Sequence, residues 1–165
     1  MILRLAKTAL VFSVALYYAF IVFNNLTDYD SNYQFVRHVL MMDTTFSGNQ
    51  GMWRALNQPA IHTVAYISLI AWEFASMLLC AWGAWRLARS LRQDANAFNS
   101  AKRIPILGLA LGMLQWFLAF IAVGGEWFLM WQSHIWNGEE AAFRVFAILG
   151  IVLLLLMQPD TADQP

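Results

Sequence analysis

Charged residues are scarce in this chain of 165 residues, because Asp, Glu, Lys and Arg together make up 12% of it. Soluble domains average about 25%, and a soluble domain of this size exposes too much surface to be covered by so few charges. The apolar share is correspondingly large, with 60% hydrophobic residues, 15% aromatic residues and a mean hydropathy of +0.53. The composition excludes a disordered chain and an ordinary soluble enzyme, and it indicates an integral membrane protein.

Several kinds of site are also missing. The single cysteine, Cys80, excludes an internal disulfide framework and a cysteine-rich zinc site. Ten basic residues balance ten acidic ones, so no nucleic-acid partner is expected. The sequence has no phosphate-binding loop and no Gly-x-Ser-x-Gly nucleophile elbow. Because no catalytic constellation is present, a non-enzymatic role is the preferred interpretation.

Four apolar stretches have the length that a bilayer requires, about 20 residues of helix. They cover residues 5–23, 63–85, 104–131 and 141–157. The sequence therefore predicts an all-α fold, an integral membrane four-helix bundle formed by one domain over residues 1–165. An outer loop over 24–62 and a cytoplasmic loop over 86–103 connect the first three spans. Residues 17–23 are bulky where a signal peptidase needs small ones, so we expect the first span to be retained as an anchor.

The basic residues predict the orientation. Seven of the ten lie before the first span or between the second and third spans, namely Arg4, Lys7, Arg86, Arg89, Arg92, Lys102 and Arg103. Lys and Arg collect on the cytoplasmic side of a membrane. We therefore expect the N- and C-termini to be cytoplasmic and the 24–62 loop to face outward.

Part of the outer loop has helical periodicity. Its apolar stripe consists of Phe35, Val36, Val39 and Leu40. We expect a short interfacial helix that lies on the outer surface or across the mouth of the bundle and ends near Asp43. The simpler interpretation is a solvated helix that covers the bundle ends. In the alternative interpretation, Arg37, His38 and Asp43 belong to an outer-face site.

Two polar side chains are expected near the membrane midplane. An unpaired ionisable group there costs about 2.5–3.5 kcal/mol on insertion scales. Glu73 and Gln115 each lie eleven residues into a span, counted from opposite sides, and so are about 16 Å deep. One interpretation is a Glu73–Gln115 hydrogen bond that ties two helices together. The alternative is that Glu73 is a proton relay or the polar anchor of a ligand site.

Two further charges lie near the outer ends of the spans. Glu126 follows Gln115 by eleven residues, close to three helical turns, so both are expected on one face of the third span. Arg144 reaches a similar depth from the fourth span. We expect a Glu126–Arg144 ion pair, acting either as a structural tie between the spans or as part of a polar pocket at the outer mouth.

All three histidines, His38, His62 and His134, fall on the expected outer side. Together with Asp43, Glu126 and Glu139 they have the donor types that zinc, copper or iron accept, and His62 with His134 could be haem axial ligands. No spacing among them is diagnostic, so the metal and the cofactor are left open. The simpler interpretation is interfacial hydrogen bonding.

Several motifs are similar to those of a known family. They comprise residues 24–29, 35–46, 124–128, 130–133, 136–138 and 142–144. These segments resemble a family of predicted small bacterial integral membrane proteins, and the likeness covers nearly the whole chain. The resemblance implies four spans and multi-pass insertion in a bacterial inner membrane. It brings no activity and no catalytic residue, because the family is described as a domain of unknown function.

Three functions are therefore considered. The preferred one is a non-enzymatic accessory or scaffold module that presents an ordered outer surface to a membrane protein partner or to a second copy of itself. The first alternative is a redox or ligand-binding subunit that holds haem, quinone or a metal near the outer mouth. The second alternative is a proton-coupled transporter that uses Glu73, which the lack of an inverted repeat disfavours.

Overall fold

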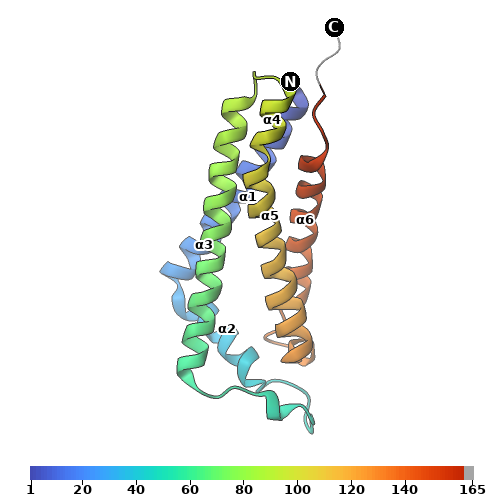
Figure 1. Ribbon diagram of the computed structural model, residues 1–165. Helices are drawn as coiled ribbons and strands as arrows, with labels where there is room; N and C mark the ends of the chain where they lie inside the picture. The colour runs from blue at the N-terminus through green and yellow to red at the C-terminus, as the bar shows by residue number, and fades with distance from the viewer. Residues whose placement is uncertain (162–165) are drawn as a thin grey trace.

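The computed structural model describes residues 1–161, and all the regular secondary structure in this part of the chain is helical. The long elements are α1 (Ile2–Thr27), α2 (Tyr29–Met41), α3 (Pro59–Ser90), α4 (Ala95–Ala101), α5 (Arg103–Leu114), η2 (Gln115–Trp127) and α6 (Glu139–Met157). Two short 3-10 turns, η1 (Met52–Arg54) and η3 (Met130–Gln132), lie in the loops. The predicted all-α class is confirmed, and Figure 1 shows the helices assembled into one elongated bundle.

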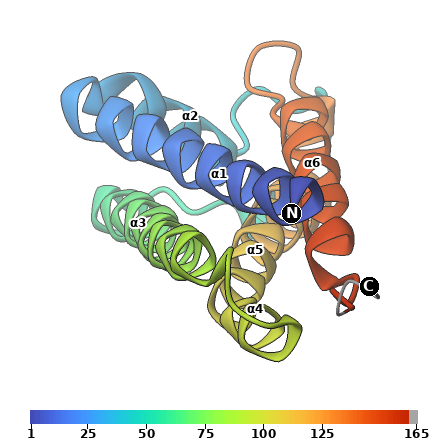
Figure 2. The same ribbon diagram turned by 90° about the horizontal axis from the view of Figure 1, so that it is seen from above.

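Four helical units are long and apolar enough to cross a membrane: α1, α3, the continuous unit Ala95–Trp127, and α6. The N-terminus, the end of α6 and the turn between α3 and α4 lie at one end of the bundle, whereas α2 and the long loops lie at the other (Figure 1). Seen from above, α1 leans outward, so that its far end lies away from the bundle axis (Figure 2). Since α2 begins only two residues after α1 ends, this tilt also determines where α2 starts.

Local sequence signals account for the helix ends. Pro59 occupies the first turn of α3, where its fixed φ suits a helix and a backbone N–H would have no partner within the helix. Asp94 caps α4 by accepting a 2.8 Å hydrogen bond from the Ala97 backbone N–H. Glu139 and Glu140 lie in the first turn of α6, where negative charge is favoured by the helix dipole. Met42 ends α2 in the left-handed conformation, with φ 53°.

Glycines allow the helices to approach one another closely. A Cβ atom at Gly108 would meet Cys80 on α3, and a Cβ atom at Gly112 would meet the Tyr18 side chain on α1. The spacing of these two glycines is a small-xxx-small motif. Within one chain it lets α5 contact α3 through one glycine and α1 through the other.

The core of the bundle is apolar, and so are the sides of the helices that face away from the core. The core contains Val11, Val14, Tyr18, Cys80, Leu87, Leu109, Leu149 and Leu156. Large apolar side chains are also exposed along the helices, for example Val64, Phe143 and Leu154 at 65%, 62% and 68%. Continuous exposed apolar surface marks an interaction with a partner or a membrane, in agreement with the length of the helices.

The second half of the third apolar helical unit is a π-helix, η2, rather than an α-helix. Its final hydrogen bond illustrates the wider turn, since Phe128 N–H donates to the Val123 carbonyl five residues earlier at 2.9 Å. The helix ends at Trp127, and Leu129 then adopts the left-handed conformation with φ 55°. Continuous helix thus stops four residues before the expected end of the span at residue 131. π-Helices are rare and occur often at functional sites.

Candidate functional site

A buried carboxylate lies near the middle of α3. Glu73 follows Pro59 by 14 residues, or about 21 Å along a helix of about 48 Å, and it is 4% exposed. Its Oε2 accepts a 2.6 Å hydrogen bond from Nδ2 of Asn25 on α1. A carboxylate in an apolar core requires such a donor, because an unpaired one would be strongly disfavoured.

Asn25 connects Glu73 to two other polar side chains. Its Oδ1 accepts a 2.7 Å hydrogen bond from Nδ2 of Asn32 on α2. The Tyr66 hydroxyl on α3 lies 3.3 Å from both Oδ1 and the backbone carbonyl of Asn25. Because α1 ends beside this part of α3, one asparagine joins three helices through its side chain.

The expected hydrogen bond between Glu73 and Gln115 is not found among the described residues, and each side chain has another partner. Gln115 is fully buried, and its Nε2 donates to the Leu69 carbonyl at 3.2 Å. Its Oε1 has no hydrogen-bond partner among the described residues, and neither does the buried hydroxyl of Ser76, one turn from Glu73. Unsatisfied buried polar atoms are uncommon and call for an explanation such as an ordered water or a ligand.

A cleft of about 290 Å³ opens beside this polar cluster. Its lining includes Tyr17 and Asn25 of α1, Asn32 of α2, Glu73 of α3 and Trp116 of η2. Five helical elements thus contribute to one cleft, since the start of α6 also lines it. Binding sites in proteins are commonly clefts of this kind with a few convergent polar groups.

A second cleft of about 270 Å³ adjoins the first. The two share Phe35, Val36, Leu69 and Phe120 as lining residues. The lining of the second cleft has no charged residue, and the apolar stripe of α2 forms one of its walls. The stripe that the sequence revealed therefore contacts a hollow apolar region between α2, α3 and η2.

The sequence comparisons place this fold in a family. A family model described as "Predicted small integral membrane protein (DUF2165)" matches residues 3–159. The chain belongs to this family. It is accordingly a multi-pass integral membrane protein surrounded by the lipid bilayer, and the resemblance noted in its motifs is confirmed. No curated protein and no solved structure matches the chain.

Glu126 and Arg144 of this membrane protein do not form an ion pair among the described residues, and both are exposed. The expectation assumed α-helical geometry between Gln115 and Glu126. Those residues belong to the π-helix η2, whose wider turn changes the face on which the eleventh residue lies. Glu139, rather than Glu126, lies against the η2 backbone, next to Gly125.

The outer-face candidates have separate environments. Nδ1 of His38 lies 2.7 Å from Oδ2 of Asp43, and the His38 ring stacks on Trp136 at 4.8 Å. Arg37 donates to the Gln34 side chain at 3.1 Å, one turn earlier on α2. These contacts stabilise the end of α2 and its packing on the loop before α6.

The other two histidines differ from His38 and from each other. His62 is buried, and its Nε2 lies 2.7 Å from the Leu56 carbonyl, whereas His134 is exposed. No group of three or more His, Cys, Asp or Glu side chains suited to a metal ion occurs among residues 1–161.

Two features of the structure were not predicted from the sequence. Asn25 was passed over because it lies just beyond the expected end of the first span; a paired Asn24-Asn25 at a helix end is the signal that could have identified it. The second feature is a charged cluster at the opposite end of the bundle, formed by Lys7, Lys102 and Asp160. No local motif predicts this cluster, because Lys7 and Asp160 are 153 residues apart.

Proposed function

We propose that this protein binds a membrane-dissolved amphiphile whose polar head lies beside Glu73 and whose apolar body occupies the adjoining cleft. The observation that carries the proposal is the continuity of the two clefts, one polar and one apolar, through shared walls. A ligand with one polar and one apolar end matches that division. This corresponds to the ligand-binding alternative derived from the sequence.

The chemistry of the polar cleft defines the head group. Glu73 offers carboxylate oxygens, and Asn25 already donates to one of them. A head that donates hydrogen bonds, such as an amine or the hydroxyl of a quinol, suits this site because a carboxylate accepts but does not donate when ionised. The haem and metal versions draw no support from the separate environments of the histidines.

The test uses two photoreactive probes with the same alkyl chain, one with an amine head and one with a hydroxyl head. In lipid nanodiscs, we expect both to label peptides that line the apolar cleft, around Val39 and Phe120. Glu73→Leu should reduce labelling by both probes at least fivefold. Glu73→Gln should reduce labelling by the amine alone, because glutamine still accepts a hydrogen bond from a hydroxyl.

The matched control is Glu140→Gln, which removes an exposed carboxylate from α6. Labelling in this variant should equal that of the unmodified protein. Ligand binding at this site would be refuted if labelling were spread over the lipid-facing sides of the helices. It would also be refuted if labelling were unchanged in Glu73→Leu.

For the orientation, we propose cytoplasmic termini in a bacterial inner membrane, with α2 as an interfacial helix at the outer surface. Seven of the ten Lys and Arg residues belong to the segments at the end of the bundle that carries the termini (Figure 1), as expected for a cytoplasmic face. With Cys80→Ser as background, Asn49→Cys should react with an impermeant maleimide in intact cells, and Gln93→Cys should react only after lysis. The reverse pattern would refute this orientation.

A second candidate function is an accessory module whose outer surface contacts a membrane protein partner or a second copy. The specific observation is an ordered cap in which Thr44 donates to Ser133 Oγ at 2.8 Å and Phe46 N–H donates to Gln132 at 3.1 Å. Trp53 on this cap is 76% exposed. A photo-crosslinking residue at position 53 should capture one discrete partner; crosslinks to lipid alone would contradict this role.

A further inference from the structure

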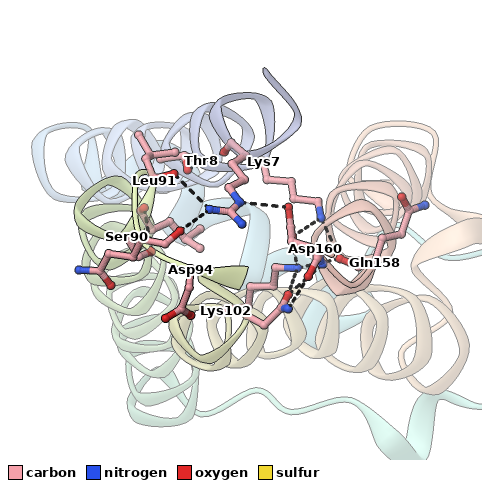
Figure 3. A network of polar contacts seen from close by, with 12 residues as sticks. Lys7, Thr8, Ser90, Leu91, Asp94, Lys102, Gln158 and Asp160 are labelled. Carbon is pink, nitrogen blue, oxygen red and sulfur yellow. Dashed lines mark hydrogen bonds and ion pairs between the residues drawn. The ribbon is translucent and has the colours of Figure 1, made fainter. Parts of the chain in front are cut away.

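A network of polar contacts lies at the end of the bundle where α1 begins and α6 ends (Figure 3). Lys7 of α1 donates to the Asp160 carboxylate at 2.7 Å and to the Gln158 carbonyl at 2.8 Å. Lys102, between α4 and α5, forms an ion pair with the same carboxylate and donates to the same carbonyl at 2.7 Å. Arg4 Nε lies 3.7 Å from the other oxygen of Asp160.

The charges in this cluster are buried and unequal in number. The side chains of Lys7, Lys102 and Asp160 are 1%, 5% and 6% exposed. Three cations surround one carboxylate, and within residues 1–161 no second carboxylate forms an ion pair with them. Buried charges are costly unless they are well paired, so an excess of positive charge here favours an anion.

The positive charges around Asp160 also affect the pKa of its carboxyl. Burial by itself raises the pKa of the Asp160 carboxyl, but the hydrogen bonds and charges of Lys102 and Lys7 outweigh burial and hold the pKa below its usual value. The carboxylate is thus the form that this cluster of cations stabilises.

The segment that supplies Asp160 is not part of a helix. It follows the end of α6 at Met157, and Asn99 on α4 holds its backbone in both directions. Asn99 Nδ2 donates to the Asp160 carbonyl at 2.9 Å, and the Asp160 N–H donates to Asn99 Oδ1 at 3.0 Å. Side chains of other segments, rather than helical hydrogen bonds, hold this short strap, and such a segment can be released more easily than a packed helix.

A surface cleft adjoins the cluster at Arg4. Arg4 also lines a cleft of about 300 Å³ together with Arg92, beside the turn between α3 and α4. The Arg4 guanidinium donates to the Gln93 carbonyl at 2.7 Å in that turn. Arg4 thus contacts both the buried cluster and this cleft, which Asp94 also lines.

We propose that Arg4, Lys7 and Lys102 form a binding site for a phosphate group, and that the Asp160 carboxylate fills this site until such a group displaces it. A phosphate presents more acceptor oxygens than a carboxylate, which suits three converging cations. The phosphate of an anionic lipid is the favoured source, because basic pockets between spanning helices bind such head groups. This site is separate from the cleft beside Glu73, and its test does not depend on that proposal.

The first experiment measures lipid retention by native mass spectrometry after the full chain is transferred from phosphatidylglycerol or phosphatidylethanolamine vesicles. We expect one phosphatidylglycerol to be retained, and Asp160→Asn to increase its retention about fivefold by removing the competing charge. Lys102→Met should abolish retention. Arg103→Met, which removes an exposed charge at the same end, should leave it unchanged.

The second experiment keeps all the cluster residues, so its result does not depend on whether a variant of the cluster folds. A spin label at Thr161→Cys, with Cys80→Ser, reports release of the strap. Phosphatidylglycerol vesicles should increase the label's mobility, whereas phosphatidylethanolamine vesicles should not. Inorganic phosphate at millimolar concentration is the parallel arm, and release by phosphate alone would assign the site to a soluble anion. Neither retention nor release with any of these probes would overturn the proposal and leave Asp160 as a structural tie.

Discussion

Replacing Asn25 with leucine would remove the side chain on which the buried polar cluster depends. Two short hydrogen bonds would be lost, the 2.6 Å bond to Glu73 and the 2.7 Å bond from Asn32. Tyr66 would keep the backbone carbonyl of residue 25 as an acceptor at 3.3 Å. Leucine has a similar volume, so the change would leave little empty space.

The expected loss of unfolding free energy in Asn25→Leu follows from these contacts. Hydrogen bonds between membrane helices contribute about 0.6 kcal/mol each on average and at most about 1.7 kcal/mol. Leaving the buried Glu73 carboxyl without its Asn25 donor adds a penalty of about 1–3 kcal/mol. We therefore expect Asn25→Leu to lower the free energy of unfolding by about 2–4 kcal/mol.

The assay is equilibrium unfolding in mixed micelles, followed by tryptophan fluorescence as the denaturing detergent is increased. Asn24→Leu is the matched control, because Asn24 is exposed and its replacement should change the free energy by less than about 0.5 kcal/mol. The double variant Asn25→Leu with Glu73→Leu should recover part of the loss, since no carboxyl would remain without its donor. A single variant that loses less than about 0.5 kcal/mol, or a double variant with no recovery, would refute the reasoning.

Three other predictions concern separate parts of the molecule. Gly108→Leu should lower the free energy of unfolding by at least about 1–3 kcal/mol in the same assay, because a Cβ there meets the α3 backbone, whereas Gly150→Ala meets only the end of a flexible side chain and should be tolerated. The stability that Asp160 contributes should be complete above its ordinary pKa of 3.8 and should decrease as the pH falls further, because its folded pKa is lower; an acid titration of unfolding should show this loss in the unmodified protein and not in Asp160→Asn. Thr44→Val should break the 2.8 Å bond to Ser133 and make the loop between α2 and α3 more sensitive to limited proteolysis, and equal cleavage rates would contradict a role for this bond in ordering the cap.

Much of the helical framework could be predicted from hydropathy and length alone. The four apolar stretches correspond to the four helices of membrane-spanning length, and the stripe around Phe35 predicted the helix α2. The sequence also singled out Glu73 and Gln115 as polar residues within the spans, and both are buried in the structure. Local regularity was sufficient for these features.

The contacts between helices required information that local patterns lack. Asn25 meets Glu73 because α1 leans and ends partway along α3, and tilt is determined by packing rather than by sequence periodicity. Glu126 was expected on the same face as Gln115, but the π-helical turn of η2 altered that relation. Polar residues at helix ends are therefore the least predictable part of this site.

The pairing of Lys7 has a consequence for how the protein is made. The acceptors of its ammonium group are the Gln158 carbonyl and the Asp160 carboxylate, which are synthesised about 150 residues later. During insertion of the first three spans, this ammonium group has neither acceptor and stays in water. Lys7 can thus serve first as a free charge that orients the nascent chain and afterwards as the contact that joins α6 to α1 once the fourth span is in place.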